Sequence, residues 1–233
     1  MLRMAADTGT TDIVATPHAN LEYTFSPEMI SRRVADLTAA TGGVPRIHEG
    51  CDFHLTFDNI QDALANPAKY TINHKRYLMV EFPDMIIFQN SGDVFDRMMT
   101  AGIVPVITHP ERNPLLRQRL ETLEKWSAGG VRIQVTAQSL LGRFGKTARR
   151  FSLELLDRGL VDFIASDAHD TKHRPPVLSD ARQWVAAHYS RDLAESLFVT
   201  NPRAAIEGQP LPGTDPGSVR KRQPWYRFWS VRE

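Results

Sequence analysis

The chain contains 233 residues, of which 42% are hydrophobic and 24% are charged, so it can bury one large core and is not a disordered chain. Its formal net charge of +1 excludes a whole-chain attraction to nucleic acid or to an anionic membrane, and its single cysteine, Cys51, excludes an internal disulfide and a cysteine-based zinc cluster. The sequence contains no apolar run as long as a membrane span and no recognisable secretory signal, so we expect a cytoplasmic protein.

Strands and helices are predicted to alternate along the chain. In chain order they are a helix ending at Gly9, a strand over 12–16, a helix over 26–40, a strand over 45–52, a helix over 59–64, a strand over 77–82, a helix over 93–101, a strand over 103–108, a helix over 115–126, a strand over 132–136, a helix over 144–158, a strand over 161–165, and helices over 178–188, 193–198 and 202–207. Each strand is apolar throughout, which is typical of a parallel sheet covered on both faces. We therefore predict an α/β fold.

Side chains that can bind a metal ion lie where the predicted strands end. They are His18, Asp52, Glu81, His109, Asp167 and His169. The carboxyl ends of the strands of a β/α barrel meet at one face, so these residues are expected to converge. For Ser166-Asp167 alone, a helix cap is the alternative, but turn and capping preferences do not account for the whole set. Nitrogen and oxygen ligands without thiolates favour Mn²⁺, Fe²⁺ or Zn²⁺.

Two arginines lie close to these residues in the sequence. Arg112 follows His109 by three positions, and Arg174 follows His169 by five. Planar guanidinium groups suit a phosphate, and a metal cluster beside them would supply hydroxide and neutralise phosphoryl oxygens. The combination predicts phosphoester cleavage, with Arg112 and Arg174 as catalytic and substrate-binding residues. The alternative for Arg112 is a salt bridge with Glu111 or Glu121.

Several motifs resemble the polymerase and histidinol phosphatase (PHP) superfamily, and more closely its bacterial manganese-dependent tyrosine phosphatase branch of capsule and exopolysaccharide synthesis. They are Thr16-Pro17-His18, Glu81-Phe82-Pro83, Thr108-His109-Pro110-Glu111-Arg112-Asn113, Gly142-Arg143-Phe144-Gly145, Ser166-Asp167-Ala168-His169 and Arg174-Pro175-Pro176. The resemblance extends from Met1 to about Pro210.

The resemblance implies a distorted seven-stranded β/α barrel that binds two to three Mn²⁺ ions, with Fe²⁺ or Zn²⁺ as alternatives. By this resemblance, metal ligands are matched by His18, Glu81, His109, Asp167 and His169, and phosphate contacts by Arg112 and Arg174. The implied substrate is the phosphotyrosine of a kinase that controls polysaccharide chain length. Whether the chain forms an oligomer is left open.

Two departures from the family pattern bear on activity. Gly50-Cys51-Asp52 stands where the family usually has a bridging glutamate, so the shorter Asp52 must reach further. The chain also has no histidine before His18, whereas the superfamily opens with a strand that bears His-x-His. On strand and helix rises, roughly 20 to 25 residues are absent, which we interpret as a misplaced start. We expect low solubility and weak activity as a consequence.

Three functions remain open at this point. The first is a metal-dependent protein-tyrosine phosphatase, the second a phosphoesterase for a small phosphomonoester such as histidinol phosphate, and the third a non-catalytic remnant that binds phosphorylated protein. We expect one domain over residues 1–212 and a basic, aromatic tail over 213–233. His48, His54 and His74 are interpreted as surface or strand residues, although the spacing of His54 from Asp52 permits a supporting role.

Overall fold

The structure is a computed structural model that describes residues 1–20 and 22–212. The expected tail over 213–233 lies outside these residues. The strands are β1 (Asp12–Ala15), β2 (His18–Ala19), β3 (Arg46–Glu49), β4 (Asp52–His54), β5 (Tyr77–Glu81), β6 (Val104–Thr108), β7 (Arg132–Thr136) and β8 (Phe163–Ala165). Pairing is parallel throughout, in a two-stranded sheet β1-β3 and a six-stranded sheet β2-β4-β5-β6-β7-β8. The predicted α/β class with parallel sheets is confirmed.

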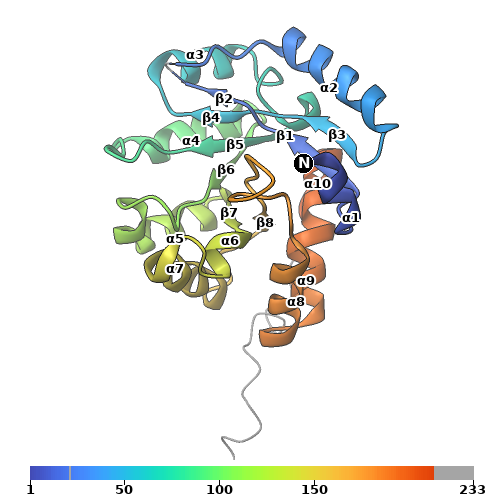
Figure 1. Cartoon of the computed structure of the whole chain (residues 1–233). Coiled ribbons are helices and arrows are strands. Elements are labelled where there is room, and N and C mark those ends of the chain that lie inside the picture. Colours follow the sequence, from blue (N-terminus) through green and yellow to red (C-terminus); the bar gives the residue numbers. More distant parts are fainter. Residues whose placement is uncertain (21, 213–233) are drawn as a thin grey trace, which may run out of the picture.

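Helices connect the strands, as Figure 1 shows. The α-helices are α1 (Leu2–Asp7), α2 (Pro27–Thr41), α3 (Phe57–Ala65), α4 (Ser91–Thr100), α5 (Leu120–Ala128), α6 (Ala137–Leu140), α7 (Gly145–Asp157), α8 (Ser179–His188), α9 (Arg191–Glu195) and α10 (Asn201–Glu207). Shorter turns are η1 (Ile72–His74), η2 (Leu116–Gln118) and the π-helical η3 (Ser196–Thr200). None of the helices in the described part of the chain combines the length and apolar composition that crossing a bilayer requires.

The predicted strand over 45–52 is wrong in one respect, because it is broken at Gly50-Cys51 into β3 and β4. The neighbouring strand breaks at the same level, at Thr16-Pro17, and resumes as β2. Proline has no N–H to donate to a ladder, and the Pro17 carbonyl instead accepts from the backbone N–H of Asp52 at 3.0 Å. As a result His18 and Asp52 begin strands instead of ending them, and they lie opposite each other in the register.

Two helix predictions also need correction. The expected helix over 115–126 is interrupted at Arg119, where a 3₁₀ turn gives way to α5. The expected helix over 193–198 starts earlier and passes from α9 into the π-helical turn η3. Arg119 has φ −127° and ψ 44°, which are not helical values. The helix-forming residues of 115–126 give no signal of this interruption.

The six-stranded sheet has two unlike faces because alternate residues of a strand point to opposite sides. One face forms the large core with the helices; its strand residues include Phe53, Leu78, Val80, Ile107, Ile133, Val135 and Ile164. The other face carries a smaller cluster of Tyr77, Val106 and Phe163, packed on Ile72 and Ala205. Glu81 lies on this second face, four residues beyond Tyr77, and Asp52 and His54 join it through their register with Met79 and Glu81. Polar side chains thus replace apolar ones at one end of this face.

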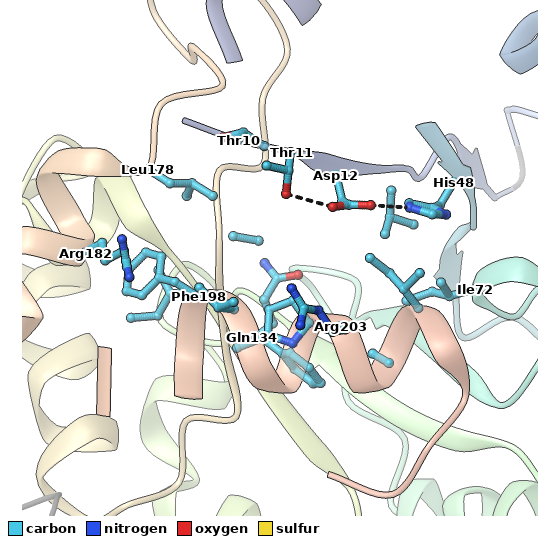
Figure 2. Close-up of a pocket in the computed structure, with 18 of the residues that line it drawn as sticks. Thr10, Thr11, Asp12, His48, Ile72, Gln134, Leu178, Arg182, Phe198 and Arg203 are labelled. Carbon is cyan, nitrogen blue, oxygen red and sulfur yellow. Dashed lines mark hydrogen bonds and ion pairs between the residues drawn. The ribbon is translucent and has the colours of Figure 1, made fainter. Parts of the chain in front are cut away.

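A cavity of about 1100 Å³ adjoins the second face, and both β1 and β8 contribute to its lining. Figure 2 shows Thr11 and Asp12 on one side of it and Gln134 and Arg203 on the other. Asp12 is fixed by the Arg46 guanidinium and by His48 Nε2, at 2.8 and 2.9 Å. The large core therefore covers only one side of the sheet completely.

The break at Gly50 predicts a specific packing requirement. A Cβ atom at this position would lie 2.7 Å from Val14 Cγ1, closer than real contacts allow. We expect Gly50→Ala to lower the free energy of unfolding by about 1–3 kcal/mol, as overpacking does. Urea denaturation would measure this. In a double-mutant cycle, Val14→Ala should recover part of the loss, whereas strictly additive effects would contradict the clash.

Asp162 predicts a pH-dependent stability at the other end of the sheet. Its carboxylate accepts from the Ile133 N–H at 2.9 Å, and burial raises its pKa to about 6 despite that bond and Arg132. The folded chain then binds more protons than the unfolded chain between about pH 4 and 6, so stability falls as pH rises through this window. Relative to Asp162→Asn, the wild type should lose stability between pH 4 and 7 in urea titrations. A difference that stays constant with pH would refute this.

Candidate metal centre

Five side chains converge at the polar end of the second sheet face. Glu81 lies at the centre, with Oε2 2.7 Å from His54 Nε2 and 3.4 Å from His18 Nδ1, and with Oε1 3.4 Å from His109 Nε2. Asp52 Oδ2 lies 3.2 Å from His18 Nδ1. Potential ligand atoms fall within 4.8 Å of one another in two groups that share Glu81, namely His18, His54 and Glu81, and Asp52, Glu81 and His109.

The donor atoms fit one or more cations. Buried atoms without a hydrogen-bond partner of suitable geometry include His18 Nδ1, Asp52 Oδ1, His54 Nε2 and Glu81 Oε2. Buried polar groups normally have partners, so a concentration of them at one place calls for an explanation such as an ion. Imidazole nitrogens and carboxylate oxygens together suit first-row divalent ions.

Electrostatics at the cluster depend on burial and on the proximity of the two carboxylates. Burial raises the pKa of Asp52, and the neighbouring Glu81 adds to this, while His18 opposes it. Burial also acts to raise the pKa of Glu81, but the neighbouring imidazoles of His54 and His109 outweigh it and lower that pKa. Burial and Arg112 lower the pKa of His109. A lower pKa favours the neutral ring, whose lone pair can bind a cation.

Asp167 lies beside the two arginines. It contacts the guanidinium groups of both Arg112 and Arg174 through the single oxygen Oδ2, and it is outside the two ligand groups. It is nevertheless close enough to the cluster for its charge to act to raise the pKa of His18 and of His109. The expected alternative for Arg112, a salt bridge with Glu111 or Glu121, does not occur among the ion pairs of the described residues.

His169 lies further out than the other predicted ligands. Its side chain is 46% exposed, and its Nδ1–H donates to the Asp167 carbonyl at 3.0 Å. The loop that carries it is closed by Asp170, whose Oδ1 accepts from the backbone N–H groups of Lys172 and His173, both at 2.6 Å, and of Arg174 at 3.3 Å. Asp170 therefore fixes the backbone from which Arg174 reaches the site.

The loop after β6 is tied to both neighbouring strands. Glu111 is fully buried and accepts from the Thr136 N–H at 3.0 Å, at the end of β7. Asn113 donates to the Phe82 and Pro83 carbonyls, at 3.2 and 3.1 Å, beyond β5. These bonds hold His109 with a left-handed φ of 36°, an unfavourable value for a residue with a Cβ atom. Asp167 has a similar φ of 48°, and such values gather at functional sites.

Phe144 supports both arginines from one side. The guanidinium carbon of Arg112 lies 4.7 Å from the centre of its ring and that of Arg174 lies 5.9 Å away. The ring face attracts the cations and limits where they can turn. Arg174 Nε is buried and has no hydrogen-bond partner, so one donor remains for an oxygen of a bound group.

His54 is the member of the cluster that sequence reasoning did not assign as a ligand. The only signal was its separation of two residues from Asp52, which places both on one face of an extended strand. His48 and His74, interpreted as surface or strand residues, contact Asp12 at 2.9 Å and Glu49 at 3.2 Å respectively, and neither belongs to the two ligand groups.

This chain is similar to known proteins of capsular polysaccharide synthesis. The family described as capsular polysaccharide synthesis, CpsB/CapC, matches residues 1–207. CapC of Staphylococcus aureus is 32% identical over 97% of this chain and 89% of its own length. The tyrosine-protein phosphatase YwqE of Bacillus subtilis is 28% identical over 96% of this chain and 89% of its own length. A crystal structure from a study of YwqE and of CpsB from Streptococcus pneumoniae, described as metal-dependent tyrosine phosphatases, superposes with a TM-score of 0.85 at 28% identity, over 94% of this chain and 90% of that chain.

The geometry predicts that His54 contributes to cation binding. His54→Ala should weaken binding of Mn²⁺ by about 10- to 100-fold, because the cluster loses a nitrogen at 2.7 Å from Glu81. Isothermal titration calorimetry with the metal-free protein would measure the affinity. His74→Ala is the matched control, since His74 contacts a glutamate outside the cluster. Equal affinities for the two variants would remove His54 from the set.

Proposed function

Because the chain belongs to the CpsB/CapC family of capsular polysaccharide synthesis, we propose that it is a metal-dependent protein-tyrosine phosphatase, a phosphoric monoester hydrolase. The observation that carries this proposal is the buried cluster of two carboxylates and three imidazoles beside two arginines that meet at one point. A phosphoester needs both a cation site and guanidinium donors, and here they are adjacent.

The proposed ligands are His18, Asp52, His54, Glu81 and His109, with Asp167 and His169 as further ligands at the edge of the site. Two to three Mn²⁺ ions are proposed, with Fe²⁺ or Zn²⁺ as substitutes, since all three accept nitrogen and oxygen donors. Cations bound there would supply activated water for attack on phosphorus and would neutralise its oxygens. Glu81 belongs to both groups of potential ligands and contacts all three imidazoles, so it would be the central ligand.

Arg112 and Arg174 are proposed to bind the phosphate of the substrate. Both guanidinium groups are directed at one carboxylate oxygen of Asp167, so their donors face a common point at which an anionic oxygen can be held. Phe144 and the Asp170 turn keep the two groups in place before substrate arrives. Preorganised donors of this kind stabilise the charge that develops in the transition state.

Cysteine chemistry is not part of the proposal. Cys51 is fully buried, and burial raises the pKa of its thiol far above neutral pH. A thiol nucleophile needs the opposite, a lowered pKa and access to substrate. The tyrosinate leaving group, with a pKa of about 10, departs with little need for protonation.

We also propose that the architecture is the distorted β/α barrel of the PHP superfamily, with one strand lacking between β1 and β8. In support, β1 pairs only with β3 and β8 only with β7 among the described residues, and the cavity of about 1100 Å³ is lined by both. The proposed substrate is phosphotyrosine on a kinase of polysaccharide synthesis.

The test compares a phosphotyrosine peptide with histidinol phosphate in the presence of Mn²⁺. We expect faster hydrolysis of the peptide, loss of activity with a chelator, and recovery when Mn²⁺ is restored. Cys51→Ser should leave turnover within about twofold, whereas Arg174→Ala should reduce kcat/KM by about 10²-fold or more. Arg33→Ala, on the exposed face of α2, is the matched control. Activity that survives chelation would overturn the proposal.

A further inference from the structure

Several exposed apolar side chains lie on the segments that follow three neighbouring parallel strands. Among the described residues, nine large hydrophobic side chains are exposed, and five of them follow β2, β4 or β5 directly. These five, named here the apolar rim, are Tyr23, Phe57, Met85, Ile86 and Phe88. Phe57 is 75% exposed and Met85 is 90% exposed, which is unusual for side chains of their size.

The apolar rim adjoins the metal centre. The strands that lead into it contain His18, His54 and Glu81, and Glu81 and His54 are the last residues of β5 and β4. Tyr23 makes the most direct contact, because its ring stacks on the His18 imidazole with the ring centres 6.4 Å apart. A chain bound at the centre would therefore cross the rim.

The segment that carries three of the rim residues is held at both ends. At its start, Asn113 donates to the Phe82 and Pro83 carbonyls, and at its end Ser91 Oγ donates to the Phe88 carbonyl at 2.7 Å. Between them Ile87 is buried in the large core. With this anchor, Met85 and Ile86 are directed outward by the fold and are not simply the unpacked part of a loose loop.

Three of the rim residues have an acidic neighbour in the sequence. Glu22 precedes Tyr23, Asp58 follows Phe57 and Asp84 precedes Met85, and all three are exposed. The segments 22–26, 54–60 and 83–90 contain no lysine or arginine. This combination attracts apolar and basic groups and repels an anionic lipid surface, so a polypeptide suits the rim better than a membrane does.

We propose that the apolar rim binds the polypeptide that flanks the phosphotyrosine, and that it selects apolar and basic residues there. This inference rests on the proposed function and specifies its substrate class. Arg112 and Arg174 would hold the phosphate, common to all substrates, while the rim distinguishes one phosphotyrosine protein from another. A small phosphate ester has no flanking polypeptide for the rim to select.

The experiment compares Met85→Ser/Ile86→Ser with Leu37→Ser/Val44→Ser, a control pair that is also exposed, at 46% and 62%, but lies on the far part of α2 and just beyond it. Substrates are a phosphotyrosine peptide flanked by Leu and Lys, the same peptide flanked by Ser and Glu, and para-nitrophenyl phosphate. For the rim variant we expect about a tenfold lower kcat/KM on the Leu/Lys peptide only. The control pair should match the wild type on all three substrates.

Binding is measured in parallel by fluorescence anisotropy, with a labelled Leu/Lys peptide that carries a non-hydrolysable phosphonate. If nothing is hydrolysed, the proposed function fails, while weaker binding by the rim variant alone would still support the rim. Equal rates and equal binding for variant and wild type would overturn it. So would rim-dependent sedimentation with phosphatidylcholine/phosphatidylglycerol vesicles, or a dimer in solution that the rim variant dissolves, without an effect on the peptide.

Discussion

Two carboxylates placed side by side in a buried environment are the constraint on which the rest of the site depends. Asp52 and Glu81 come from adjacent parallel strands, and like charges at this range repel strongly when water is excluded. Three imidazoles surround them, and neutral imidazoles cannot balance two negative charges. The sheet therefore concentrates a demand for positive charge at one end of one face, which divalent ions would meet. Hydrophobic packing on the opposite face supplies the rigidity that keeps the two acids together.

The loops around this end are fixed from outside the cluster. Glu111 and Asn113 bind the backbone of the strands on either side, and Asp170 collects three backbone N–H groups of its own loop. These bonds offset the cost of left-handed backbone at His109 and Asp167. The residues next to the site are thus held by neighbours that lie outside the two ligand groups.

Much of this arrangement is predictable from the sequence, for identifiable reasons. Continuous apolar strands between helices indicate a parallel sheet, and its geometry brings His18, Asp52, Glu81 and His109 together although they are far apart in the chain. The role of His54 is less accessible, because its environment depends on the register between β4 and β5. The contact of Asp167 with both arginines is equally hidden, since it depends on how two loops fold over one another. Local patterns contain neither kind of long-range information.

The break shared by the first two strand pairs has a consequence for how this family varies. Ala15 pairs with Glu49 and His18 pairs with Asp52, so two residues separate the paired segments on each strand. Deleting one residue of Thr16-Pro17 would turn the His18 imidazole to the opposite surface of the sheet, and deleting one residue of Gly50-Cys51 would do the same to the Asp52 carboxylate. Length changes here can be accommodated only when both strands change together. In an alignment of distant members, gaps at Thr16-Pro17 and at Gly50-Cys51 should therefore appear as a matched pair.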